Sequence, residues 1–174
     1  IVLVPQKFEV TVRGEDTLVY PQGDRSAPPS GRMPGSGFFF DSIVRQNHFD
    51  ENALDPEDNL QEFAHLDDAG LDHYRRDTAR ARATGRGVAA TMPGTGLGDI
   101  ALVPAPFLAD PKGIRDVTEW YVSLVSRQDY VHRVFSRQTE IALANLARIK
   151  DVAVDNIDVA FVCGTDFGTQ SSTF

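Results

Sequence analysis

The chain has 174 residues, of which 41% are hydrophobic and 24% are charged, values that are ordinary for a globular protein. Its formal net charge of −8 disfavours nucleic acid as a partner. No apolar run approaches the ~20 residues that a membrane-spanning helix needs, so we expect no membrane contact. The single cysteine, Cys163, excludes an internal disulfide framework and favours a reducing compartment, so we expect a cytoplasmic protein.

Residues 1–45 predict a β-hairpin followed by a loop. Residues 8–12 alternate apolar and polar side chains, and residues 18–20 follow across a turn at Gly14-Glu15-Asp16, which is typical of a hairpin. Residues 21–37 are rich in glycine and proline and predict a loop. The run Phe38-Phe39-Phe40 predicts a short aromatic strand. Such a run can roof an apolar substrate, but anchoring the loop to a core is the commoner role.

Four helices are predicted after residue 55. Asp55 before Pro56 marks the start of the first, and the second spans about residues 67–84, with Gly85 as its stop signal. Asp116 has the character of a cap for the third helix, and a fourth runs from about residue 126 to Lys150.

Two short strands are predicted among these helices, at residues 87–90 and at residues 157–161, and the second reads as buried. Strands separated by helices of this length pair in parallel through right-handed crossovers. We therefore expect a parallel pair whose carboxyl ends lie at one edge, where α/β enzymes present their chemistry.

The main site candidates follow the second strand. Asp166 stands directly after the apolar run, where a carboxylate can act as an acid or base or bind a cationic or N–H-bearing substrate. The alternative is an N-cap for a following helix, and position alone leaves both interpretations open. Thr165 and Gln170 are expected to orient the substrate. Met92, at the end of the earlier strand, is expected to line the same pocket.

Other motifs favour structural interpretations. Metal ligation by Cys163 is disfavoured because no histidine or second cysteine lies nearby at ligand spacing. The segment from Gly94 to Gly98 lacks the dinucleotide-binding spacing and predicts a tight substrate-facing loop. The arginines between residues 75 and 86 lie at helical spacing and favour a solvated face over an anion site.

Several motifs together resemble the uroporphyrinogen decarboxylase superfamily, and most closely the decarboxylase-like proteins grouped with corrinoid-dependent methyltransferases. The most specific is Asp-x-Gly-x-Gln after a barrel strand, which Asp166, Gly168 and Gln170 match position for position. The resemblance covers about residues 7–174. Its other motifs are Gly31-Arg32-Met33-Pro34, Gly37-Phe38-Phe39-Phe40-Asp41, and Gly113-Ile114-Arg115-Asp116 with Glu119-Trp120-Tyr121.

The resemblance implies a (β/α)8 barrel, which typically needs about 250 residues. We therefore predict an α/β fold that is a partial (β/α)8 TIM barrel with an N-terminal β-hairpin decoration. Residues 1–174 would form a single partial domain, with the decoration in residues 1–45 and the barrel units in residues 55–174. The absence of an initiator Met and the ending just after the last strand also predict a fragment. The missing remainder of the barrel would then be its partner.

The resemblance implies two activities. The methyltransferases use a zinc site with His and Cys ligands to activate a thiol, and they exchange methyl with a corrinoid carried on a partner protein. The decarboxylases remove acetate carboxylates from a porphyrinogen in heme biosynthesis without a cofactor. They use an early arginine loop and an aspartate near the pyrrole nitrogens.

Neither the zinc motif nor the arginine loop lies in this chain, so we expect it to bind no cofactor by its own residues. The hairpin and the Asp166–Gln170 ending favour methyl transfer, with Asp166 as the catalytic residue. Decarboxylation is the alternative, and a non-catalytic binding protein on the same barrel is a third hypothesis. We expect no activity from the fragment alone.

Overall fold

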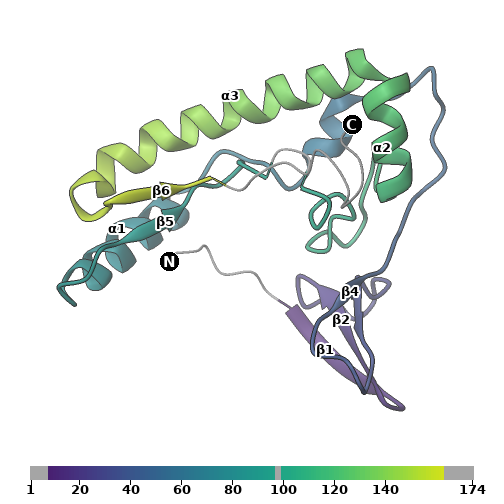
Figure 1. The fold of residues 1–174 in the computed structure, drawn as a ribbon, viewed down its shortest axis with the longest axis horizontal. Helices are drawn as coiled ribbons and strands as arrows, with labels where there is room; N and C mark the ends of the chain where they lie inside the picture. Colours follow the sequence, from purple (N-terminus) through teal and green to yellow (C-terminus); the bar gives the residue numbers. More distant parts are fainter. Residues whose placement is uncertain (1–7, 97–98, 163–174) are drawn as a thin grey trace, which may run out of the picture. The chain divides into compact units, whose positions relative to one another are not determined.

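A computed structural model of the chain describes residues 8–96 and 99–162 (Figure 1). The chain forms two compact units that alternate along the sequence. Within the described residues, unit 1 comprises residues 63–96 and 135–162, and unit 2 comprises residues 8–62 and 99–134.

Unit 2 begins with a four-stranded antiparallel sheet in the order β1-β2-β3-β4. Its strands are β1 (Phe8–Arg13), β2 (Asp16–Pro21), β3 (Gly31–Met33) and β4 (Asp41–Ser42). The pairing of β1 with β2 confirms the predicted hairpin. The two-residue turn needs Gly14 in a left-handed conformation, with φ of 64°. The strand β3 was missed, because it lies inside the glycine- and proline-rich segment. The aromatic run is not a strand, since β4 begins only at Asp41.

The rest of unit 2 contains little regular structure. Its elements are the 3-10 helix η1 (Pro56–Leu60), the helix α2 (Val117–Ser126) and the first turns of α3 (Gln128–Ala153). The Asp116 carboxylate accepts hydrogen bonds from the backbone N–H groups of Thr118 at 2.7 Å and Glu119 at 3.1 Å, which confirms the predicted cap of α2. The helix predicted after Asp55 is only a 3-10 turn, although Asp55 does cap it.

Unit 1 packs helices against a two-stranded parallel sheet. It contains α1 (Asp68–Arg82), β5 (Ala89–Thr91), the longer part of α3, the 3-10 helix η2 (Val154–Asn156) and β6 (Val159–Phe161). The strands β5 and β6 pair in parallel, as predicted. The buried core joins α1, β5 and α3 through Tyr74, Ala90, Met92, Ile149 and Ala153.

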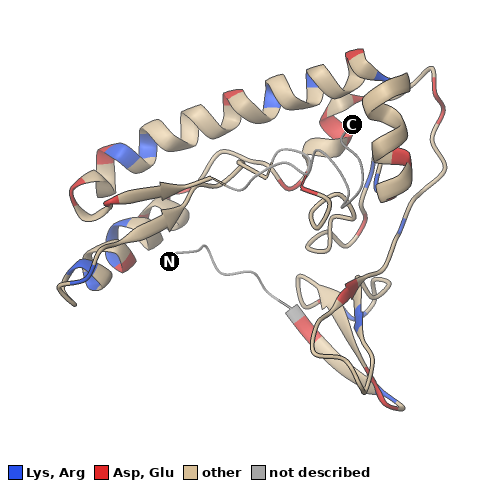
Figure 2. Ribbon diagram, in the orientation of Figure 1, with Lys and Arg blue, Asp and Glu red and all other residues tan. Residues whose placement is uncertain are grey.

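Charged residues of both signs lie along the helices of unit 1 (Figure 2). On α1, Arg75 pairs with Asp72, and Arg82 pairs with Asp158 at 2.7 Å. The arginine-rich segment therefore carries acidic neighbours and is not a continuous basic face. None of the described helices is long and apolar enough to cross a membrane.

The predicted partial (β/α)8 barrel is wrong. The described residues form a four-stranded antiparallel sheet and a separate two-stranded parallel sheet, and they close no barrel. One strand–helix–strand unit was read correctly, but a single parallel pair does not specify an eight-fold repeat. The hairpin belongs to a sheet of its own and does not decorate a barrel. The strand β6 is also not buried, because Val159 is 56% exposed and Phe161 is 49% exposed.

Candidate functional site

The first candidate site is the carboxyl edge of β5 and β6. The N–H of Met92 donates to the carbonyl of Phe161 at 3.1 Å, so the pairing continues one residue past β5. The segments that leave the two strands therefore begin side by side. In open α/β sheets this edge is where ligands bind.

Side-chain hydrogen bonds fix the start of the segment after β5. The Tyr74 hydroxyl donates to the carbonyl of Thr91 at 2.6 Å, and the Thr95 hydroxyl donates to the carbonyl of Met92 at 2.7 Å. Gly94 has φ of 79°, and a Cβ there would lie 3.6 Å from the Ala142 side chain. A tight loop was predicted here, and its contact with substrate stays a prediction.

Of the four predicted site residues, the structure describes one, Met92. Met92 is 7% exposed and packs in the core of unit 1, and its role as a pocket wall stays a prediction. Thr165, Asp166 and Gln170 lie outside the described residues, as does Cys163. Their roles also stay predictions.

The described side chains do not gather into a group suited to a metal ion. Within residues 8–96 and 99–162, no group of three or more His, Cys, Asp or Glu residues could hold a metal ion. These described residues therefore do not form the zinc site that the resemblance implies.

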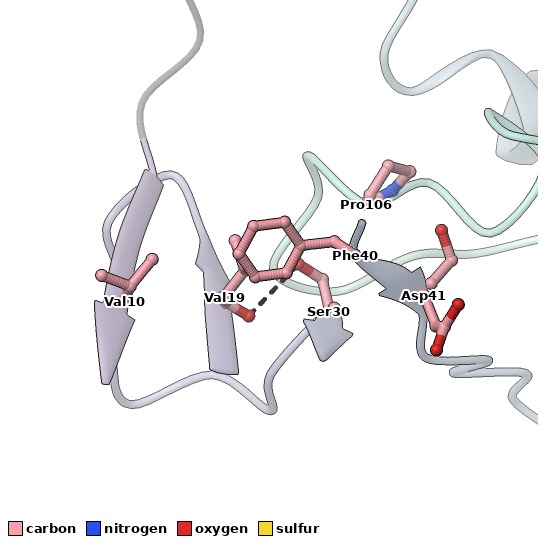
Figure 3. Close-up of a pocket in the computed structure, with 8 residues that line it drawn as sticks. Val10, Val19, Ser30, Phe40, Asp41 and Pro106 are labelled. Atoms are coloured by element: carbon pink, nitrogen blue, oxygen red, sulfur yellow. Dashed lines mark hydrogen bonds between the residues drawn. The ribbon is translucent and has the colours of Figure 1, made fainter. Parts of the chain in front are cut away.

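The second candidate is an apolar pocket of about 230 Å³ on the sheet of unit 2 (Figure 3). Its walls include Val10, Val19, Gly31, Phe40 and Pro106. Figure 3 shows the Phe40 ring lying toward Val19 and the Asp41 carboxylate pointing away from the ring. The pocket can hold an apolar group but offers it few hydrogen bonds.

The aromatic run does not anchor its loop as predicted. Phe38 is 90% exposed and Phe39 is 84% exposed, so among the described residues neither is buried in a core. Phe40 is half-exposed and lines the apolar pocket. The alternative interpretation, in which the run roofs an apolar ligand, is compatible with this position.

Within the Gly113–Asp116 motif, the Arg115 side chain makes structural hydrogen bonds. Arg115 is 1% exposed, and its guanidinium donates to both carboxylate oxygens of Glu62, at 2.7 and 3.1 Å. It also donates to the carbonyls of Asp58 at 2.8 Å and Lys112 at 2.5 Å. A guanidinium satisfied in this way stabilises the backbone around it and is not free to bind a substrate.

Asn59 and Tyr130 continue this buried network. The Asn59 amide donates to the carbonyl of Ile114 at 2.8 Å and accepts from the N–H of Ile114 at 2.7 Å. The Tyr130 hydroxyl donates to the same amide oxygen at 2.6 Å. Burial, as the largest cause, raises the pKa of Tyr130 to about 12. The sequence contains no signal for these contacts, because their partners lie far apart along the chain.

A hollow of about 590 Å³ in unit 2 is lined by Phe49, Glu51, Glu119 and Arg127. The guanidinium pairs with Glu51 and Glu119 and lies 5.4 Å from the centre of the Phe49 ring. The hydrogen bond from Arg127, as the largest cause, lowers the pKa of Glu51. Because two carboxylates face one guanidinium, this hollow does not favour an anionic ligand.

Comparison of the chain with protein-family models, with curated proteins and with solved structures gives no match. These comparisons give no support to the resemblance to the uroporphyrinogen decarboxylase superfamily, which stays a prediction.

Proposed function

We propose that this chain is part of a small-molecule enzyme whose site lies at the carboxyl edge of β5 and β6. The observation that supports this location is the parallel pairing, which the Met92–Phe161 hydrogen bond extends beyond the strands. Asp166 follows Phe161, the last residue of β6, by five positions in the sequence. Carboxyl edges of parallel strands are the usual location of sites in α/β enzymes.

The proposed reaction is methyl transfer involving a corrinoid and a zinc-activated thiol. Support for this reaction comes from the match of Asp166, Gly168 and Gln170 to the Asp-x-Gly-x-Gln motif. The zinc ion would be held by residues other than those described, and the corrinoid by a partner protein. A cytoplasmic location belongs to the same proposal and rests on the single cysteine.

Within this proposal the chain's own residues bind and orient the substrate. The Asp166 carboxylate accepts a hydrogen bond or a proton from the reacting molecule. The hydroxyl of Thr165 and the amide of Gln170 hold that molecule in position. Met92, one residue past the end of β5, lines the same pocket.

The decisive experiment compares Asp166→Asn with Asp151→Asn in the purified protein that contains this chain. Asp151 is an exposed residue of α3 and serves as the matched control. The assay follows methyl transfer from methylcobalamin to a thiol. We expect Asp166→Asn to lower the rate about 100-fold or more, because positioned acid–base groups contribute about 10²–10⁴-fold. We expect Asp151→Asn to leave the rate unchanged.

Each other outcome has a defined meaning. Release of CO2 from uroporphyrinogen in place of methyl transfer would replace the proposal by decarboxylation. Binding of a corrinoid or porphyrinogen without turnover would favour a non-catalytic protein. An Asp166→Asn variant as active as Asp151→Asn would remove Asp166 from the site.

A further inference from the structure

The strand β1 is a long edge strand. Among the described residues it pairs only with β2, and its six residues contain no proline or bulge and carry two opposite charges, Glu9 and Arg13. The opposite edge, β4, has only two residues, and Asp41 is one of them. Native proteins commonly protect a sheet edge by making it short or by interrupting it with a proline or a bulge, and a longer edge without these features is a template for another strand.

The register defines which backbone groups of β1 are free to pair. Arg13 and Asp16 close the two-residue turn as a hydrogen-bonded pair, so alternate residues from Arg13 backwards bond to β2. The N–H and C=O groups of Val10 and Val12 therefore face the open edge. Val10 is 50% exposed and Val12 is 75% exposed, which leaves this edge accessible.

We propose that β1 pairs antiparallel with β1 of a second copy of this chain, with Thr11 on the two-fold axis. In this register Glu9 lies opposite Arg13 of the other copy, and Val10 lies opposite its Val12. Symmetry repeats both pairs, so opposite charges meet twice and apolar side chains meet on the other face. Centring the pair on Val10 would place Glu9 opposite Thr11, and centring it on Val12 would place Thr11 opposite Arg13. Only the Thr11 register matches opposite charges.

One existing contact changes on pairing. Arg25 pairs with Glu9 at 2.6 Å and donates to the carbonyl of Val10 at 3.3 Å. Both side chains of this ion pair are about half exposed, and exposed pairs contribute little to stability. In the dimer the Val12 N–H of the other copy replaces Arg25 on the Val10 carbonyl.

The assembly stops at two copies. Joining two sheets through β1 leaves a β4 strand at each end of an eight-stranded sheet. Each of these ends has only two residues and carries the exposed Asp41, so it does not continue the sheet.

The test is a charge swap measured by sedimentation of the full chain. Glu9→Arg and Arg13→Glu should each weaken the dimer by at least about tenfold, because like charges then oppose each other twice. The double variant Glu9→Arg/Arg13→Glu should restore the dissociation constant to within about threefold. Arg13→Glu does not change the Arg25–Glu9 pair, so it separates the interface from that contact.

A cross-link tests the register independently of folding stability. In a Cys163→Ala background, Thr11→Cys should form a disulfide-linked dimer, because non-hydrogen-bonded antiparallel pairs bring Cα atoms to about 4.5 Å. Thr17→Cys on the inner strand β2 should not cross-link. A monomer at all concentrations, growth beyond two copies, or failure of the double swap to restore the dimer would overturn the proposal.

Discussion

The two units of this chain are stabilised in different ways. Unit 1 is built from helices on a parallel strand pair, and its core is a cluster of apolar side chains around Tyr74 and Ile149. Unit 2 has long segments without helix or strand, and buried polar side chains hold those segments in place. The difference shows that polar side chains can supply hydrogen bonds to buried backbone groups where no helix or strand supplies them.

In unit 2 the partners of backbone groups are guanidinium and amide side chains. Arg45 donates to the carbonyls of Ala105 at 2.7 Å and Leu108 at 2.6 Å. The Gln46 oxygen accepts from the N–H groups of Arg115 at 2.6 Å and Asp116 at 2.9 Å. Unit 2 should therefore be sensitive to loss of single polar groups. Matched substitutions, one in each unit, test this contrast.

The largest contrast is expected between two arginine–carboxylate pairs. Arg115→Ala in unit 2 leaves Glu62 without its buried partner and should cost about 3–5 kcal/mol of unfolding free energy. Arg82→Ala in unit 1 breaks a pair whose side chains are 45% and 39% exposed, so its effect should be several-fold smaller. Urea unfolding followed by far-UV circular dichroism reports the helices of unit 1, and Trp120 fluorescence reports unit 2, because Trp120 is the single tryptophan and lies buried in α2. Equal effects of the two changes would contradict the contrast.

A smaller difference is expected between two left-handed glycines. Gly113 and Gly85 have φ of 78° and 73°. Gly85→Ala meets no atom within 4 Å and should cost only the backbone strain, about 1 kcal/mol. Gly113→Ala meets the Asn59 side chain as well and disturbs its hydrogen bonds, so we expect about 2–4 kcal/mol. Unfolding midpoints of the two variants measure the difference, and a Gly113→Ala protein as stable as Gly85→Ala would show that Asn59 can move freely.

The smallest effects concern two buried hydroxyls. Tyr130→Phe removes a short hydrogen bond to Asn59 and a longer one to the Asp55 carbonyl, Tyr74→Phe removes the one to the Thr91 carbonyl, and each change should cost about 1 kcal/mol. The pKa of Tyr130 is about 12 in the folded protein against 10.0 for an unperturbed tyrosine. The folded state therefore binds this proton more tightly, and the stability it supplies is complete below pH 10 and is lost as the pH rises toward 12. Unfolding measured at pH 9 and pH 11 should show a smaller alkaline loss for Tyr130→Phe than for the wild type, and an unchanged loss would reject the assignment.

Local structure could be predicted where the sequence carries its own signals. The helix predicted over about residues 67–84 is α1, and Gly85 has the positive φ expected just after the end of that helix. The cap of α2 and the hairpin were predicted for the same kind of reason, since each depends on residues within a few positions. Parallel pairing of β5 and β6 followed from the helices between them.

The features that could not be predicted depend on contacts between residues far apart in the sequence. Arg115 and Glu62 are 53 positions apart, and nothing in their neighbourhoods shows that they pair. The barrel was wrong because one parallel pair does not specify how many strands join it. The candidate site was predicted only in part, because β5 and β6 place Met92 and the exit of Phe161 together, whereas Asp166 lies outside the described residues.

One buried side chain of unit 1 makes the two backbone hydrogen bonds that a neighbouring strand would otherwise make. Asn145 of α3 is fully buried, and its amide accepts from the N–H of Leu66 at 2.8 Å and donates to the carbonyl of Ala64 at 2.9 Å. A single carboxamide thus presents to this extended segment the same donor and acceptor that a neighbouring peptide group would. The path of the chain into α1 therefore depends on a side chain about 80 positions downstream. An aspartate at that position would have the same size and could still accept from the Leu66 N–H, but when ionised it could not donate to the Ala64 carbonyl.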